Sequence, residues 1–200
     1  MHKKMIVLSA LGVLIAAIMA CTSISGNEQA VTDNAWLPAK DSAARVKRGE
    51  YLVKTIGCDD CHSPKKMGPH GPEIIPELRL SGFPKTAKLP ELDTKAVQKG
   101  WVLLAPDLTA AIGPWGISYA SNLTSDQTGI GNWKEENFLK AIREGKLKGI
   151  DGSRPILPPM PWFTYRNMTD EDLKSIFAYL KTIKPVNNAV PNPKALIEMK

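Results

Sequence analysis

The sequence has 200 residues, a formal net charge of +6 and 43% hydrophobic residues. This length fits one globular domain with short extensions. Its lysines and arginines form no dense run interleaved with aromatic residues, which argues against a nucleic-acid-binding protein. Composition alone does not identify the function, so short motifs along the chain are the more informative signal.

The N-terminus has the pattern of a secretory signal. Lys3 and Lys4 precede an apolar run over residues 5–20, and a charged region followed by a short hydrophobic one directs export. A transmembrane helix is the alternative, but the run is shorter than the roughly 20 residues that cross a bilayer. The sequence predicts a cleaved signal peptide over residues 1–20, whose removal takes the net charge from +6 to +4 because its only charged residues are two lysines.

Cys21 follows this run directly. Residues 18–21, Ile-Met-Ala-Cys, resemble the end of a bacterial lipoprotein signal, in which the cysteine becomes the acylated N-terminus. Several acyl chains on one residue anchor a protein stably. The polar residues after Cys21 lack a sustained period, so we expect a flexible tether over 21–40. The predicted location is the periplasmic side of a bacterial membrane.

The folded domain is predicted over residues 41–184, with a tail over 185–200. Its first helix extends from Asp41 to a stop at Gly57, because apolar residues recur there near helical spacing. These apolar residues are Ala44, Val46, Tyr51, Leu52 and Ile56. This helix leads directly into the motif with the clearest chemistry.

The motif is Cys58-x-x-Cys61-His62, which is compatible with a zinc site, a redox disulfide or an attached haem. Outside it the chain has one cysteine and two histidines, so the four ligands of a structural zinc site are hard to assemble. A thioredoxin-like pair would need alternating strands and helices, which the sequence does not indicate. The spacing predicts one covalent haem c, because two thiols one helical turn apart can each bond a vinyl group while His62 ligates the iron.

Residues 63–121 are rich in proline and glycine, which argues against long regular elements and predicts a loop insertion. Covering the apolar surface of a haem would explain so long a loop. A second helix is predicted from a cap at Asn132 to Gly145, and a third from Thr169 to Thr182, before Pro185. These helices would pack on the first to form the core.

This order of elements resembles that of class I c-type cytochromes over about residues 45–183. The segments SNLTSDQTGIGNW, RPILPPMPW and MTDEDLKSIFAYLK are similar to parts of the cytochrome modules of bacterial periplasmic electron-transfer systems, including cytochrome subunits of membrane-bound dehydrogenases. The resemblance implies an all-α domain, a small cytochrome c fold of three or more helices around one haem. The long insertion departs from the smallest members of this class.

The second axial ligand separates an electron carrier from a gas-binding protein, since a methionine opposite the histidine closes the iron to other ligands. Met160 lies among Pro158, Pro159 and Pro161, which restrict the backbone and can present its side chain at a fixed angle. The resemblance also implies a ligand from such a loop before the last helix. Met168, next to a helix cap, or an open or His70-ligated iron are the alternatives.

Other cofactor contacts follow less directly from the sequence. We expect the free N–H of His62 to donate to a backbone carbonyl, and the resemblance implies a proline after the motif, Pro69 or Pro72. Candidates for hydrogen bonds to the haem propionates are Asn122, Thr124 and Trp133, although a turn and core packing explain them equally well.

The predicted function is one-electron transfer by a membrane-tethered carrier or a cytochrome subunit of a respiratory complex, rather than an enzyme. Its predicted partners are a redox protein, such as a dehydrogenase or oxidase, and the lipid membrane. The alternative is a haem enzyme or gas sensor with an exchangeable sixth position, in which His70 would be the available distal acid or base.

Overall fold

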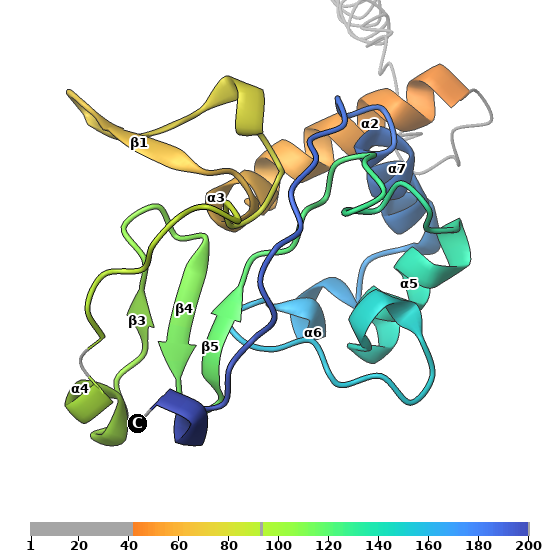
Figure 1. The fold of residues 1–200 in the computed structure, drawn as a ribbon. Helices are drawn as coiled ribbons and strands as arrows, with labels where there is room; N and C mark the ends of the chain where they lie inside the picture. The colour runs from red at the N-terminus through yellow and green to blue at the C-terminus, as the bar shows by residue number, and fades with distance from the viewer. Residues whose placement is uncertain (1–41, 93, 200) are drawn as a thin grey trace, which may run out of the picture. The chain divides into compact units, whose positions relative to one another are not determined.

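The computed structural model describes residues 42–92 and 94–199. The predicted signal peptide, the tether and Cys21 lie outside the described residues and stay predictions. The α-helices of the described chain are α2 (Ser42–Thr55), α3 (Cys58–His62), α4 (Thr94–Gln98), α5 (Glu135–Glu144), α6 (Trp162–Tyr165) and α7 (Asp170–Leu180) (Figure 1). Short 3-10 turns cover Pro76–Leu78, Leu147–Gly149 and Leu196–Met199.

The three longest helices, α2, α5 and α7, are those that the sequence predicted. Thr169 caps α7 by accepting a hydrogen bond from the Asp172 N–H at 3.1 Å. Gly145 ends α5 in the left-handed conformation with φ 65°, which glycine adopts without steric cost. The cap of α5 differs from the prediction: it is Lys134, not Asn132, and its N–H donates to the side chain of Asn137.

Helix α2 packs along α7, and the two helices lie side by side in Figure 1. Gly49 allows this approach, because a Cβ at that position would overlap the carbonyl oxygen of Ser175 in α7. An ion pair between Arg48 and Asp172 at 2.9 Å joins the same two helices. The close packing fixes the end of α2 and therefore the start of α3.

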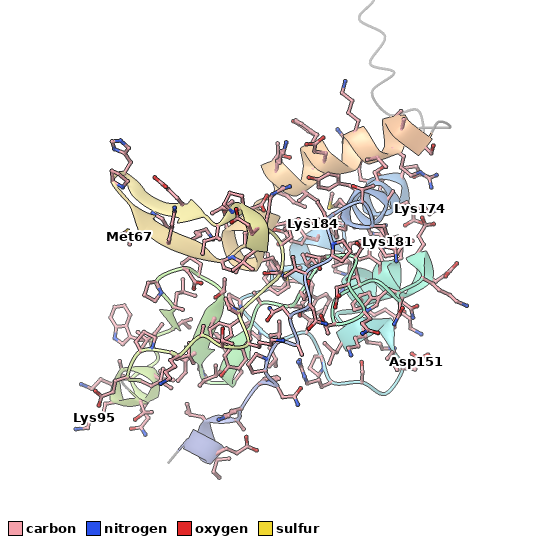
Figure 2. The ribbon with its side chains drawn as sticks, turned by 45° about the horizontal axis from the view of Figure 1, so that its top comes forward. Met67, Lys95, Asp151, Lys174, Lys181 and Lys184 are labelled. Atoms are coloured by element: carbon pink, nitrogen blue, oxygen red, sulfur yellow. The ribbon has the colours of Figure 1, made fainter. Side chains whose placement is uncertain are left out.

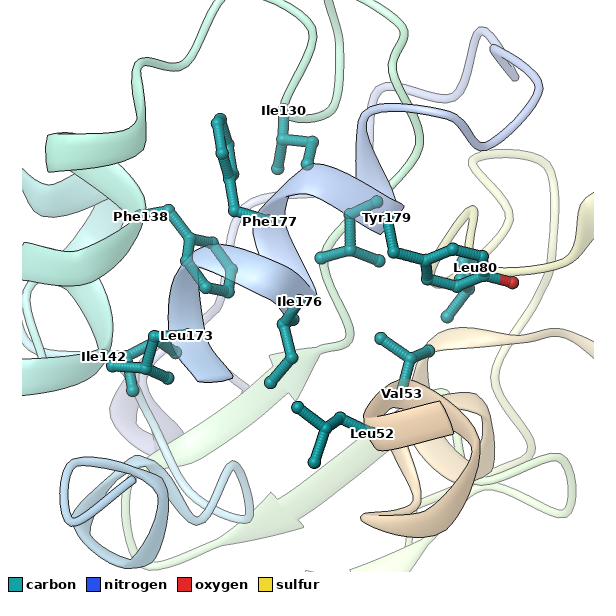
Figure 3. Close-up of a cluster of buried hydrophobic side chains, with 11 residues drawn as sticks. Leu52, Val53, Leu80, Ile130, Phe138, Ile142, Leu173, Ile176, Phe177 and Tyr179 are labelled. Carbon is teal, nitrogen blue, oxygen red and sulfur yellow. The ribbon is translucent and has the colours of Figure 1, made fainter. Parts of the chain in front are cut away.

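The main hydrophobic core lies between these helices and α5 (Figure 3). Phe138 of α5 and Phe177 of α7 contact each other with their ring centroids 5.4 Å apart. Val53 of α2, fully buried, packs in the same cluster. Each such side chain contributes about 1.5–3 kcal/mol on burial. This core holds the helical part of the fold together.

The predicted all-α fold class is wrong, because residues 65–119 form two small antiparallel sheets and the domain is mixed α/β. The strands are β1 (Lys65–Gly68) and β2 (Gly71–Ile74) in one sheet, and β3 (Leu103–Leu104), β4 (Ala110–Gly113) and β5 (Gly116–Tyr119) in the other. The density of proline and glycine rules out long elements but not strands of four residues joined by tight turns.

The two hairpins built from four-residue strands have turns with the same Gly-Pro-x-Gly pattern. Gly68-Pro69-His70-Gly71 joins β1 to β2, and Gly113-Pro114-Trp115-Gly116 joins β4 to β5. Gly71 and Gly116 have φ values of 121° and 94°, a region that favours glycine. The β1–β2 hairpin projects from the rest of the domain in Figure 2, where the exposed Met67 is labelled. A repeated Gly-Pro-x-Gly signal therefore marks both turns.

The C-terminal segment runs beside β5, an edge strand of the three-stranded sheet, as Figure 1 shows. The buried side-chain amide of Asn188 donates to the carbonyls of Ser81 and Phe83 at 2.7 and 2.9 Å. Farther along, Lys194 pairs with Ile117 of β5 through two main-chain hydrogen bonds. The predicted tail is thus held to the insertion. None of the helices in residues 42–92 and 94–199 combines the length and apolar character of a membrane span.

Candidate functional site

The Cys-x-x-Cys-His motif forms α3, one turn of helix that begins after Gly57 in the left-handed conformation. Burial raises the pKa of Cys58 to about 12, and burial with the nearby Asp60 carboxylate raises that of Cys61. Neither side chain is therefore activated as the thiolate that attacks disulfides. No three Cys, His, Asp or Glu side chains of the described chain are grouped to hold a metal ion by themselves.

The imidazole of His62 is buried, and its Nδ1 lies 2.8 Å from the carbonyl oxygen of Ser121. A carbonyl only accepts, so Nδ1 carries the proton and Nε2 keeps its lone pair. Burial lowers the pKa of His62, which favours the neutral ring that ligates metals. Pro69 and Pro72, predicted as the acceptors, lie exposed in the β1–β2 hairpin, and Ser121 takes that role instead.

A cavity of about 400 Å³ lies against this motif. Its wall includes Cys58, Cys61 and His62 from α3, together with Met160 from the proline-rich loop. The other lining residues are mostly apolar; some come from α5, α7 and the β4–β5 hairpin, and the rest from the loops between the elements and from α6. Apolar cofactor sites have volumes of roughly 300–1,000 Å³. Two thiols, a free imidazole nitrogen and a thioether around one apolar cavity fit a covalently attached haem.

The cavity sets His70 apart from the two methionine candidates for the sixth ligand. Met160 and Met168 both line it, and both pack beside the main core. Met160 lies in an irregular segment after a cis peptide between Pro158 and Pro159, whereas Met168 precedes the cap of α7. His70 lies exposed at the tip of the β1–β2 hairpin and is not among the lining residues.

Of the three residues predicted to contact the propionates, one lines the cavity and two do not. Trp133 lines the cavity. Asn122 and Thr124 are buried outside it: the Asn122 side chain accepts from Thr124 at 2.8 Å and donates to the Val186 carbonyl at 2.9 Å, so these residues hold the C-terminal segment.

Two cations on the cavity wall were not predicted. Lys148 and Arg154 line the cavity, and neither is among the ion pairs of the described chain. Burial lowers the pKa of Arg154, whose Nη1 donates only to the carbonyl of Pro155. Cations without a carboxylate partner beside an apolar cavity suit the carboxylates of a bound cofactor. No local pattern distinguishes these two from the other basic residues.

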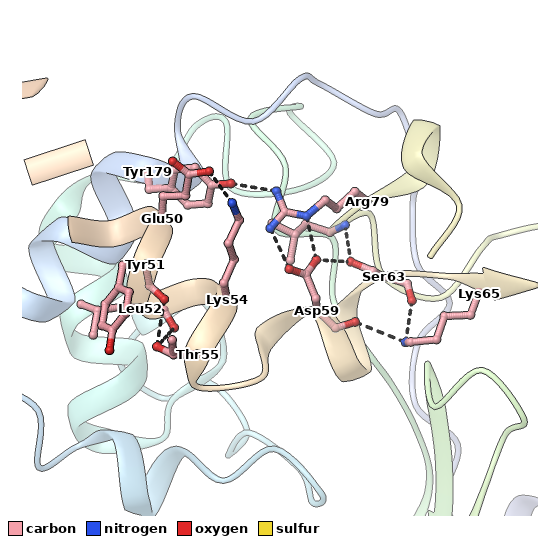
Figure 4. Close-up of polar contacts among 11 residues, drawn as sticks. Glu50, Tyr51, Leu52, Lys54, Thr55, Asp59, Ser63, Lys65, Arg79 and Tyr179 are labelled. Carbon is pink, nitrogen blue, oxygen red and sulfur yellow. Dashed lines mark hydrogen bonds and ion pairs between the residues drawn. The ribbon is translucent and has the colours of Figure 1, made fainter. Parts of the chain in front are cut away.

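A polar network holds α3 from its outer side (Figure 4). Arg79 donates through Nε and Nη2 to the two carboxylate oxygens of Asp59, at 3.0 and 2.7 Å. Its Nη1 donates to the Tyr179 hydroxyl of α7 at 2.7 Å, and Ser63 donates to Asp59 at 2.6 Å. The network connects the motif to the last helix and to the insertion.

Comparisons with known proteins match this chain to cytochromes. The cytochrome c family model matches residues 46–184, a range that contains α3 and the Met160 loop. The fructose dehydrogenase cytochrome subunit of Gluconobacter japonicus is 31% identical over 159 residues, which are 78% of this chain and 25% of that protein. The gluconate 2-dehydrogenase cytochrome c subunit of Pantoea cypripedii is 32% identical over 148 residues, 73% of this chain and 25% of that protein.

A third relative is part of a nicotinate dehydrogenase. This protein, from Pseudomonas putida, is 39% identical over 151 residues, which are 75% of this chain and 10% of that protein. The chain thus spans a quarter or less of the length of these three relatives.

Proposed function

This chain belongs to the cytochrome c family, with haem c as its covalently bound cofactor and electron transfer as its function, and we propose that His62 and Met160 are the two axial ligands of its iron. Haem c supplies a one-electron couple between ferric and ferrous iron. The residues of the chain hold the group, keep water from its faces and determine which ligands reach the iron. Cys58 and Cys61 form the thioether bonds.

One observation carries the proposal: a single apolar cavity is lined by the motif cysteines, by His62 and by Met160. The Nδ1–Ser121 hydrogen bond leaves Nε2 of His62 for the iron and fixes the ring plane. A thioether on the other side would saturate the iron, and a saturated iron transfers electrons without binding exchangeable ligands.

Met160→Ala and Met168→Ala form a matched pair for the test, because both methionines line the cavity and pack beside the core. We expect ferrous Met160→Ala to bind carbon monoxide and its ferric form to lose the long-wavelength methionine-to-iron charge-transfer band, with haem still covalently attached. Met168→Ala should keep the band and remain closed to carbon monoxide. The opposite pattern would make Met168 the ligand, and a wild-type protein that binds carbon monoxide readily would support an open site.

We also propose that the protein works in the periplasm, anchored by a lipid on Cys21, and passes electrons to or from a redox protein. The relatives named as cytochrome subunits of fructose and gluconate dehydrogenases support a dehydrogenase as this partner. After gentle detergent extraction, a free carrier would elute alone in size-exclusion chromatography, whereas a subunit would elute with a dehydrogenase.

A further inference from the structure

The end of the insertion contacts the surroundings of both proposed ligands. The carbonyl of Ser121 accepts from Nδ1 of His62 at 2.8 Å. Three residues earlier, the hydroxyl of Ser118 in β5 donates to the carbonyl of Pro158 at 2.6 Å, two residues before Met160. One short segment thus reaches the histidine on α3 and the loop that carries the methionine.

The Met160 loop has few other ways to be held. Proline has no N–H, so Pro158, Pro159 and Pro161 donate no main-chain hydrogen bond. The loop is fixed at its start, where the Ile156 N–H donates to the Gly145 carbonyl at 2.7 Å. Between that bond and α6, Leu157 and Met160 still have an N–H, but neither donates a hydrogen bond within the described chain. The carbonyl acceptors of this stretch therefore matter more for its anchoring, and they need a donor from elsewhere in the chain.

Ser118 is well placed to be this donor. It is 7% exposed, and it lies opposite Ala111 in the β4–β5 register. Its single O–H has the Pro158 carbonyl at 2.6 Å and the Ala111 carbonyl at 3.5 Å, and the shorter distance favours Pro158. Its oxygen accepts from the indole N–H of Trp115 at 3.2 Å. The Trp115 ring packs against Gly113, where a Cβ would leave it no room. The hydroxyl is therefore oriented from the hairpin turn towards the ligand loop.

We propose that the β4–β5 hairpin controls the iron's sixth ligand through Ser118, which positions the Met160 loop by holding the Pro158 carbonyl. This proposal rests on the proposed role of Met160 as a ligand. Ser118 is a positioning residue, because its hydroxyl bonds the loop and the loop presents the thioether. It also gives the insertion a function: the insertion supplies the acceptor for one ligand and the donor that fixes the other.

The test measures how easily an external ligand displaces the methionine. Imidazole is titrated into the ferric holoprotein of the wild type and of Ser118→Ala. A net hydrogen bond of ordinary strength corresponds to roughly fivefold in an equilibrium constant, so we expect Ser118→Ala to bind imidazole about fivefold more tightly. The methionine-to-iron charge-transfer band should remain at zero imidazole, since the ligand is loosened and not removed.

The chain offers a control in Ser125, whose hydroxyl likewise donates to a main-chain carbonyl, that of Ile183, at 2.6 Å. Unlike Ser118, Ser125 does not line the cavity. Ser125→Ala should bind imidazole as the wild type does. An equal increase in both serine variants would indicate general loosening and would overturn the proposal, as would an unchanged affinity in Ser118→Ala.

Two further variants distinguish a failure of the Ser118 inference from a failure of the Met160 ligand assignment. Trp115→Phe removes the indole donor to Ser118 and part of the ring that packs against Gly113, and we expect a smaller increase in imidazole affinity. If one variant yields little holoprotein, wild-type imidazole affinity in the other refutes the hairpin's role. Met160→Ala should bind imidazole without competition, far more tightly than the wild type. If it does not, the ligand assignment fails; if it does while Ser118→Ala matches the wild type, only the inference fails.

Discussion

Replacing Arg79 with alanine tests whether the network behind α3 stabilises the haem motif. The variant removes two hydrogen bonds to Asp59 and one to Tyr179. It leaves a carboxylate that is 15% exposed with Ser63 as its remaining side-chain donor. The Asp59 carboxylate would then be mostly buried from water without the positive charge that offsets this burial.

The expected loss in the free energy of unfolding of Arg79→Ala lies between two limits. Exposed ion pairs contribute at most about 1 kcal/mol, whereas breaking a fully buried pair costs about 3–5 kcal/mol. The Arg79 and Asp59 side chains are 26% and 15% exposed, so we expect a loss of about 2 kcal/mol in the free energy of unfolding. For a domain of this size that lowers Tm by about 4–8 °C.

Thermal and urea unfolding of the holoprotein, followed by circular dichroism, measure this loss. Lys54→Ala is the control, because Lys54 pairs with Glu50 at 2.6 Å in the same region but with side chains 55% and 43% exposed. It should leave the free energy of unfolding almost unchanged, because exposed ion pairs contribute little to stability. Arg79→Lys should be intermediate, since lysine keeps the charge but not the bidentate geometry. If Arg79→Ala is no less stable than Lys54→Ala, the network does not stabilise the motif.

Two further predictions concern the cofactor's charge and the membrane. In Arg154→Ala, the midpoint potential should fall as pH rises from about 5 to 8, because a propionate without the guanidinium has a higher pKa and its ionisation then favours ferric iron. Spectroelectrochemical titration should show a midpoint potential that hardly changes with pH in the wild type. An equal dependence on pH in both proteins would contradict the assignment of Arg154 to a propionate. Cys21→Ser should move the protein from the membrane to the soluble fraction, because it removes the acylated residue, and an unmodified Cys21 peptide in the mass spectrum of the membrane-bound wild type would contradict a lipid anchor.

The helices could be predicted from sequence because their signals are local. The Thr169 cap and the glycine that ends α5 each act within one or two turns, and both are present in the structure. The strands were missed for a physical reason. Strands of four residues have too few positions to establish an alternating pattern, and the high glycine and proline content was attributed to loops. The repeated Gly-Pro-x-Gly turns were the available signal, at residues 68–71 and 113–116.

The site residues also fall into those with a local sequence signal and those without one. The haem attachment motif is contiguous, so Cys58, Cys61 and His62 can be recognised in five residues. The groups that hold this motif come from distant parts of the chain. The carbonyl that accepts the hydrogen bond from His62 is 59 residues away, and nothing in a sequence marks one carbonyl among many. The hydroxyl that holds the Met160 loop is 40 residues before its acceptor. Both come from the insertion, which sequence alone suggested only as a cover for the haem.

A c-type cytochrome keeps its cofactor through two thioether bonds whatever the rest of the chain does, so the non-local contacts are free to determine how firmly each axial ligand stays on the iron. For that reason, substitutions in the insertion should alter ligand exchange at the iron before they alter haem retention.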